Sequence, residues 1–179
     1  MRIIGGKYKG RMFNPGKNFT ARPTTDFAKE SLFNILQNQY AFEDLKVLDL
    51  FSGTGSIGYE FLSRGCTNLT MVELNFKNLQ FIKAVIKELN EVAKVYRADV
   101  FKYLENEKGK FDLIFADPPY DLPHFADVVP LVLRRNILSE NGVFIIEHPK
   151  NFDFGKQPEF IEMRRYGSVH FSFFKNKEK

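Results

Sequence analysis

The sequence predicts an α/β fold: a mostly parallel sheet of seven strands with helices on both faces. From residue 46 onward, short apolar runs alternate with segments of helical period, the pattern of a covered parallel sheet. Turn residues separate these segments, and no repeat or linker divides the 179 residues, so one domain is expected. Apolar residues make up 44% and charged residues 27% of the chain, which excludes a disordered or collagen-like protein.

The first segment, residues 1–24, is predicted to be a short β-hairpin extension before the main domain at 25–179. Its expected strands are Arg2–Ile4 and Gly10–Phe13, with glycine turns. This segment holds six basic residues and no acid, whereas the other 20 basic and 22 acidic residues give the domain a net charge of −2. A basic extension predicts contact with a polyanion. The residues expected to bind nucleic-acid phosphates are Lys7, Lys9, Arg11, Lys17 and Arg22, together with Thr24 at a helix N-terminus.

The remaining elements follow in chain order. Thr24 or Thr25 offers the N-cap of a helix that extends to about Asn38. Apolar runs predict strands at 47–51, 69–72, 92–98, 111–116 and 142–146, and two more between 160 and 174. Helices are expected at 57–64, over the apolar stripe between residues 79 and 89, and at 125–135.

An acid lies at the end of each of the first five predicted strands after residue 46. These acids are Asp49, Glu73, Asp99, Asp117 and Glu147. Ligands of such sheets bind at the carboxyl ends of the strands, so this edge is the candidate site.

A glycine-rich loop follows the first of these strands. It contains the pattern G-x-G-x-x-G over Gly53, Gly55 and Gly58, and Glu73 follows Gly53 by twenty residues, which indicates a nucleotide-type cofactor. Both NAD(P) and S-adenosylmethionine fit the loop. Asp49 favours the second, because its charge repels a pyrophosphate and suits a cationic amino group. The expected cofactor residues are Asp49, Ser52, Gly53, Thr54, Gly55 and Glu73, with Asp99 and Val100 at the adenine.

The turn Asp117-Pro118-Pro119-Tyr120 follows the fourth of these strands. Two prolines fix the backbone, so the Asp117 carboxylate and the Pro118 carbonyl form a fixed pair of acceptors. Such a pair suits an NH2 group on a planar base, and Tyr120 supplies a ring on which the base can stack. All four residues are therefore predicted to be catalytic.

Together these motifs resemble the RsmD family, whose members are 16S rRNA guanine-N2 methyltransferases named for guanine(966). The turn itself is typical of amino-group methyltransferases of nucleic acids. The matching segments are Met1–Gly6, Lys9–Arg11, Arg22–Asp26, Lys29–Asn34, Asp49–Gly55, Ser63–Gly65 and Tyr166–Gly167.

The resemblance implies a Rossmann-like methyltransferase fold, S-adenosylmethionine as donor, and a guanine flipped out of an RNA loop. It also implies 16S rRNA as partner, within an assembling small ribosomal subunit, and a monomer is expected. The chain shows neither a signal peptide nor an apolar run of ~20 residues, so we expect a cytoplasmic protein without membrane contact. One cysteine and three scattered histidines predict no metal site.

Three other readings stay open at this point. The same turn serves adenine-N6 and glutamine-amide methylation, because those groups also carry an NH2 on a planar carbon. An NAD-dependent oxidoreductase explains the glycines and leaves the proline turn unexplained. A non-catalytic RNA-binding module explains the basic extension and leaves the acids unexplained.

Overall fold

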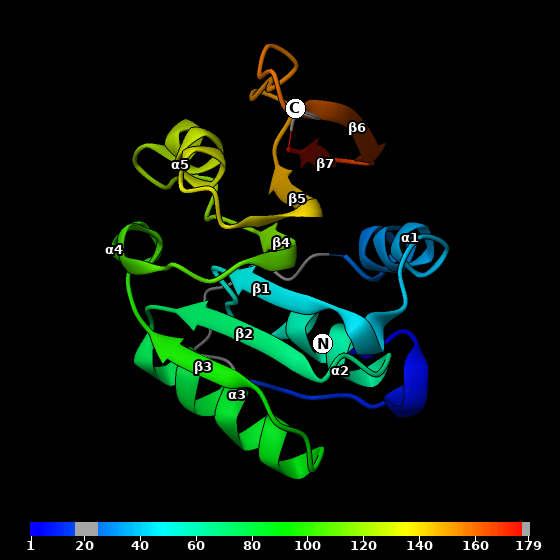
Figure 1. Cartoon of the computed structure of the whole chain (residues 1–179). Helices are drawn as coiled ribbons and strands as arrows, with labels where there is room; N and C mark the ends of the chain where they lie inside the picture. The colour runs from blue at the N-terminus through cyan, green and yellow to red at the C-terminus, as the bar shows by residue number, and fades with distance from the viewer. Residues whose placement is uncertain (17–24, 177–179) are drawn as a thin grey trace.

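A seven-stranded sheet with the strand order β3-β2-β1-β4-β5-β7-β6 forms the centre of the computed structural model, which describes residues 1–16 and 25–176 (Figure 1). Neighbouring strands from β3 to β5 pair in parallel, while β7 runs antiparallel between β5 and β6. The strands are β1 (Lys46–Leu50), β2 (Asn68–Glu73), β3 (Lys94–Arg97), β4 (Phe111–Ala116), β5 (Leu138–His148), β6 (Phe160–Tyr166) and β7 (Val169–Lys175). This order confirms the predicted fold class.

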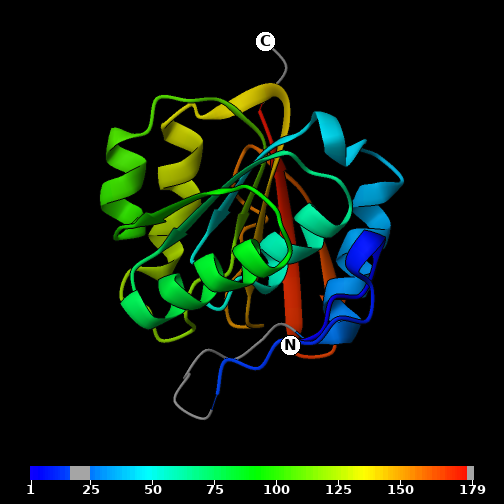
Figure 2. The ribbon, with the colours of Figure 1, turned by 90° about the horizontal axis from the view of Figure 1, so that it is seen from below.

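Helices cover both faces of the sheet (Figure 2). On one face, alternate strand residues such as Val47 and Leu113 pack with α1 (Asp26–Gln37), α2 (Ser56–Ser63) and α3 (Phe76–Glu88). On the other, Leu48 and Ile114 pack with α4 (Val100–Asn106), η3 (Phe125–Asp127) and α5 (Val128–Arg134). Because strand residues alternate between faces, central strands covered on both sides are mostly apolar, which explains the apolar runs in the sequence.

Most element boundaries agree with the sequence expectations within a few residues, and one helix differs. The sequence predicted no helix between 99 and 110, yet α4 begins at Val100. It is seven residues long, which is too short to show a clear helical period. β5 also begins earlier than expected, at Leu138.

The first sixteen residues lie against the domain rather than apart from it. Their expected strands are reduced to one antiparallel bridge between Arg2 and Met12, and the 3-10 turn η1 (Gly6–Tyr8) forms the tip. Ile3 and Phe13 are buried in the same core as α1 and α2. The hairpin is therefore a docked part of the fold.

A buried ion network fixes the hairpin to α1 and α2. Lys29 donates through Nζ to the Arg2 carbonyl at 2.6 Å and lies 3.4 Å from Glu60 Oε1. Glu60 also accepts from the Ile4 amide at 2.6 Å and pairs with Arg64. Burial of unpaired charge is costly, so the pairing keeps these groups in place. Residues 42–44 form a further short turn, η2 (Phe42–Asp44).

Candidate active site

The carboxyl ends of β1 to β5 meet at one edge of the sheet, which we call the carboxyl edge. Because these strands are parallel neighbours, the structure brings the expected site acids to one side of the domain. Glu73 and Glu147 lie at the ends of β2 and β5, and Asp99 and Asp117 lie just beyond β3 and β4. Asp49 lies one residue before the end of β1.

The glycine loop turns tightly between β1 and α2. Phe51, Gly53 and Gly55 all have positive φ angles, of 58°, 55° and 87°. At Gly55 a Cβ atom would lie 2.5 Å from Tyr59 Cζ, so only glycine fits this position. Ser52 donates its amide to the Val72 carbonyl at 3.0 Å, which holds the loop against β2. The neighbouring Thr54 is buried.

Glu73 joins the loop to the end of β2. Its carboxylate accepts the Gly53 amide at 2.8 Å and the Asn75 amide at 2.6 Å, one on each oxygen. Burial raises the pKa of Glu73, while these backbone donors counteract the rise. A carboxylate has about four acceptor positions, so these two bonds fix its orientation and leave capacity for hydroxyl donors.

Asp49 lies deeper than the sequence indicated. Its side chain shares the sheet face covered by α2, near Gly58, and only 1% of the residue is exposed. Burial raises the pKa of Asp49 to about 7, and the nearby Glu73 charge adds to the rise. Among the described residues, Asp49 Oδ2 has no hydrogen-bond partner. A buried acceptor of this kind is an attractive position for a cationic group.

Asp99 has a structural bond that the sequence did not reveal. It is the N-cap of α4, and its Oδ1 accepts the Lys102 amide at 3.1 Å. Val100 begins the helix and is buried against the core. The carboxylate is therefore fixed at the end of β3, on the same edge as Glu73.

The Asp117–Tyr120 turn is held between two strands. The Asp117 amide donates to the Leu50 carbonyl at the end of β1, at 3.4 Å, and Pro118 is buried while Pro119 is exposed. The Tyr120 hydroxyl donates to Glu147 Oε1 at 3.3 Å.

Glu147 lies at the same edge and contacts Tyr120, although it was not among the residues selected from the sequence. It is 4% exposed. The register that pairs Ala116 with Ile146 brings Asp117 beside Glu147. The sequence did carry one signal for Glu147, because it is the fifth of the acids that lie at the ends of the predicted strands.

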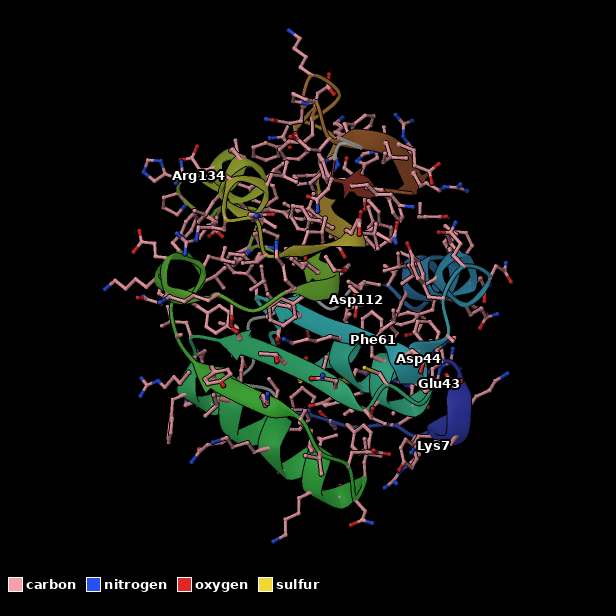
Figure 3. The ribbon with its side chains drawn as sticks, in the orientation of Figure 1. Lys7, Glu43, Asp44, Phe61, Asp112 and Arg134 are labelled. Carbon is pink, nitrogen blue, oxygen red and sulfur yellow. The ribbon has the colours of Figure 1, made fainter. Side chains whose placement is uncertain are left out.

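Of the expected RNA-binding residues, the three that the structure describes, Lys7, Lys9 and Arg11, lie on the hairpin and away from the carboxyl edge. Lys7 pairs with Glu91 at 2.5 Å and Arg11 with Glu88 at 2.6 Å. Glu88 is the last residue of α3, and Glu91 lies three residues beyond it. Because α3 runs back from the carboxyl edge, the tip of the hairpin lies at the opposite, amino end of the strands (Figures 1 and 3). Lys9 is exposed.

Three of the expected RNA-binding residues, Lys17, Arg22 and Thr24, lie outside the described residues. The N-cap of α1 is Thr25, whose side chain accepts the Ala28 amide at 3.2 Å. No helix in the described ranges is long and apolar enough to cross a membrane.

Comparison with known proteins identifies the family. The family model of conserved hypothetical protein 95 matches residues 1–175. Bacillus subtilis YlbH is 35% identical over 186 residues, which cover 99% of this chain and 100% of YlbH. Ribosomal RNA small subunit methyltransferase D of Haemophilus influenzae is 34% identical over 158 residues, which cover 84% of this chain and 80% of that protein.

Solved structures show the same fold. Escherichia coli yhhF matches with a TM-score of 0.85 at 25% identity, covering 100% of this chain and 99% of that chain. The T. thermophilus 16S rRNA N2 G1207 methyltransferase, solved with AdoMet and guanosine, matches with a TM-score of 0.70 at 20% identity, covering 89% of this chain and 45% of that chain. The fold is thus the α/β methyltransferase fold, and the chain belongs to the conserved hypothetical protein 95 family, the RsmD family that its motifs resemble.

Proposed function

We propose that this protein transfers a methyl group from S-adenosylmethionine to the exocyclic N2 of a guanine in 16S rRNA. One observation carries the proposal. The Asp117–Tyr120 turn is anchored to the end of β1 and to Glu147, so it lies beside the loop that Glu73 holds. An acceptor pair for an amino group and a loop for a nucleotide-type cofactor therefore share the carboxyl edge.

The residues at this edge fit S-adenosylmethionine. The Glu73 carboxylate suits the two ribose hydroxyls, because its backbone bonds already fix its orientation. Asp49 suits the cationic amino end of the methionine moiety, since its buried Oδ2 has no partner among the described residues. Asp99, with the adjoining Val100, lies where it can accept the adenine amino group. Gly53 and Gly55 let the backbone approach closely.

S-adenosylmethionine, when bound, supplies an electrophilic methyl group on a sulfonium sulfur. The protein's task is then mainly positioning, and effective molarities of well-oriented groups reach about 10⁵–10⁸ M. The Asp117 carboxylate and the Pro118 carbonyl accept the two N–H groups of guanine N2, which turns the nitrogen lone pair toward the methyl group. Tyr120 stacks on the base, and Glu147 holds the Tyr120 hydroxyl and thereby the ring.

The substrate base must leave its stack to reach this turn. Base flipping costs a few kcal/mol, and least for a base that is already unpaired. A nucleotide in an rRNA loop of an assembling small subunit meets this condition. The proposal also takes the protein to act on this nucleotide as a monomer. Asp117 would stabilise the positive charge that develops on N2 as the bond from N2 to the methyl group forms and the methyl–sulfur bond breaks, with S-adenosylhomocysteine as the leaving group.

The proposal is tested with Asp117→Asn, and Asp127→Asn serves as control because it removes the same charge from an exposed acid. We expect methyl transfer from labelled donor to unmodified 16S rRNA to fall roughly 100-fold or more in the first variant, the scale for loss of one group that stabilises transition-state charge. Calorimetry should show unchanged donor binding. Full activity of Asp117→Asn would contradict the assignment.

A further inference from the structure

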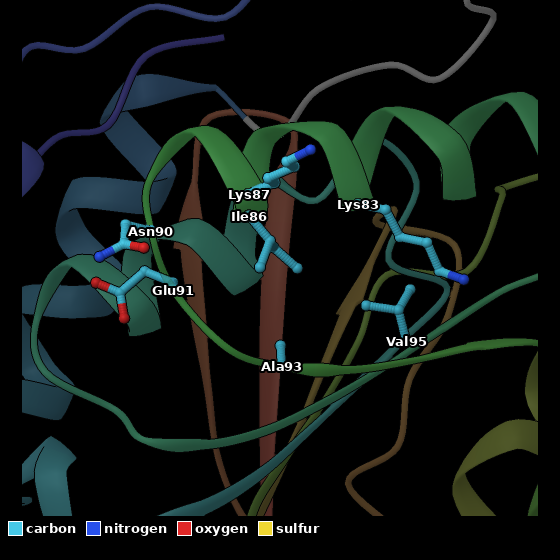
Figure 4. A pocket seen from close by; sticks show the side chains of 7 residues that line it. All are labelled: Lys83, Ile86, Lys87, Asn90, Glu91, Ala93 and Val95. Carbon is cyan, nitrogen blue, oxygen red and sulfur yellow. The ribbon is translucent and has the colours of Figure 1, made fainter.

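A groove of about 480 Å³ lies between α3 and the edge strand β3, away from the proposed active site (Figure 4). Lys83, Lys87 and Asn90 line its α3 side, Glu91 its end, and Ala93 and Val95 its β3 side. Both lysines are exposed, and Lys83 extends from the helix toward Val95. The groove therefore combines two exposed lysine side chains with a small apolar floor.

The groove is part of a longer stripe along α3. Phe76, Lys83 and Lys87 are separated by seven and four residues within α3, so they share one face of the helix, and Asn90 follows just beyond its end at Glu88. Phe76, the first residue of α3, begins this stripe and is 49% exposed. The Arg97 guanidinium lies over its ring, with Cζ 5.2 Å from the ring centroid. A cation and an aromatic ring thus extend the lysine row to the end of β3.

The acids of this region are already paired with the hairpin. Glu91 accepts from both Lys7 and the Tyr8 hydroxyl, and Glu88 pairs with Arg11. Their charges therefore do not cancel those of Lys83 and Lys87. The main domain has a net negative charge, but net charge does not show which of its acids form ion pairs. A positive surface can therefore lie on a domain whose net charge is negative.

The stripe joins two parts of the molecule that are far apart. It extends from Arg97 at the carboxyl edge to the hairpin tip at the amino end of the strands. A helix of thirteen residues such as α3 is about 20 Å long. This length is comparable to the distance spanned by several consecutive phosphates of one nucleic-acid strand. An RNA that contacts the tip and enters the active site can follow this path.

We propose that the groove is a docking surface for the rRNA that flanks the target nucleotide; the inference rests on the proposed function. Lys83 and Lys87 bind phosphates as point charges. Phe76, at the start of the stripe, offers its ring to an unpaired base. The paired hairpin residues Lys7 and Arg11 orient the hairpin and neutralise the acids, and the lysines of α3 make the contact.

The experiment compares the wild type with Lys83→Gln/Lys87→Gln and with the control Lys108→Gln/Lys156→Gln. The control removes the same charge from two exposed lysines outside the stripe. Affinity for an unmodified 16S rRNA transcript is measured from 50 to 200 mM salt, with methyl transfer on the same samples and thermal melts to check folding. We expect the groove variant to bind roughly tenfold more weakly at low salt. Its slope of log affinity against log salt should fall by about two.

Three outcomes are informative. Equal affinity and salt slope in the groove and control variants would overturn the inference. So would a groove variant that binds the transcript normally and loses activity only on assembled small subunits, since that result indicates a protein partner. A wild type that binds rRNA without methylating it would contradict the proposed function, while the binding comparison still decides the role of the groove.

Discussion

Replacing Asp49 with asparagine should change stability in a pH-dependent way. The wild-type carboxyl is fully buried, and its pKa rises from 3.8 to about 7 because burial disfavours the charge. Asparagine has nearly the same shape and no titration. The Tyr59 hydroxyl, also without a partner among the described residues, lies close enough for the Asp49 charge to raise its pKa, and it offers an acceptor for the new amide.

The difference in proton binding between the folded and unfolded protein decides whether stability rises or falls with pH. Between pH 4 and 7 the folded protein holds a proton on Asp49 that the unfolded chain releases, so wild-type stability falls as pH rises through this range. The pKa change from 3.8 to about 7 corresponds to about 4 kcal/mol, at ~1.36 kcal/mol per pH unit. About 2.5 kcal/mol of this is lost between pH 5 and pH 8.

Urea unfolding followed by circular dichroism at pH 5, 6.5 and 8 measures this effect. The stability difference between Asp49→Asn and the wild type should shift by about 2.5 kcal/mol in favour of the variant from pH 5 to pH 8. Calorimetry should show weaker S-adenosylmethionine binding by the variant at pH 8, because the charge that attracts the amino group is gone. A stability difference that is constant with pH, or unchanged donor affinity, would refute the reasoning.

Three further substitutions or reactions test other parts of the site. Gly55→Ala places a Cβ atom 2.5 Å from Tyr59 Cζ at a φ of 87°. Urea unfolding should therefore show that the free energy of unfolding falls by about 1–3 kcal/mol. An unchanged unfolding midpoint would contradict the clash. Tyr120→Phe removes the hydroxyl that binds Glu147. It should lower kcat roughly five- to tenfold, which corresponds to about 1 kcal/mol of activation free energy, with little change in KM for rRNA. A change confined to KM in steady-state kinetics would count against this role. Cys66 is buried, and burial raises its pKa to about 11, so a thiol reagent at pH 8 should label it only in denaturant; fast labelling of the native protein would disprove this.

The sheet and its carboxyl edge could be predicted because their signals are local. Central strands are buried on both faces, so residues such as 111–116 form apolar runs that end at a turn, and the boundaries of β4 agree. Glycine and proline turns mark where those strands end. The acids at these ends then share an edge because parallel strands do so.

The depth of individual acids could not be predicted, because it depends on tertiary packing. Asp49 and Glu73 both end strands, yet Asp49 points under α2 while Glu73 holds the glycine loop. Asp99 combines a place at the end of β3 with the capping of α4, a helix too short to show a period. The Tyr120–Glu147 bond joins residues 27 positions apart, and no spacing rule indicates it.

The pairing of charges was equally hidden from the sequence. Lys7 and Arg11 belong to the most basic segment, but their partners Glu91 and Glu88 are about eighty residues away. Only the docked hairpin shows that Glu91 and Glu88 pair with Lys7 and Arg11 rather than with Lys83 and Lys87. A count along the chain does not show which charges of the hairpin are paired.

The most direct test of the proposed activity is the identity of the methylated nucleoside. Unmodified 16S rRNA, free and in small subunits, is incubated with the wild type and labelled S-adenosylmethionine, digested to nucleosides and analysed by mass spectrometry. The Asp117→Asn variant is run in parallel. We predict N2-methylguanosine in the wild-type digest and little or none in that of the variant. N6-methyladenosine, or no methylated nucleoside from a folded protein that binds the donor, would contradict it.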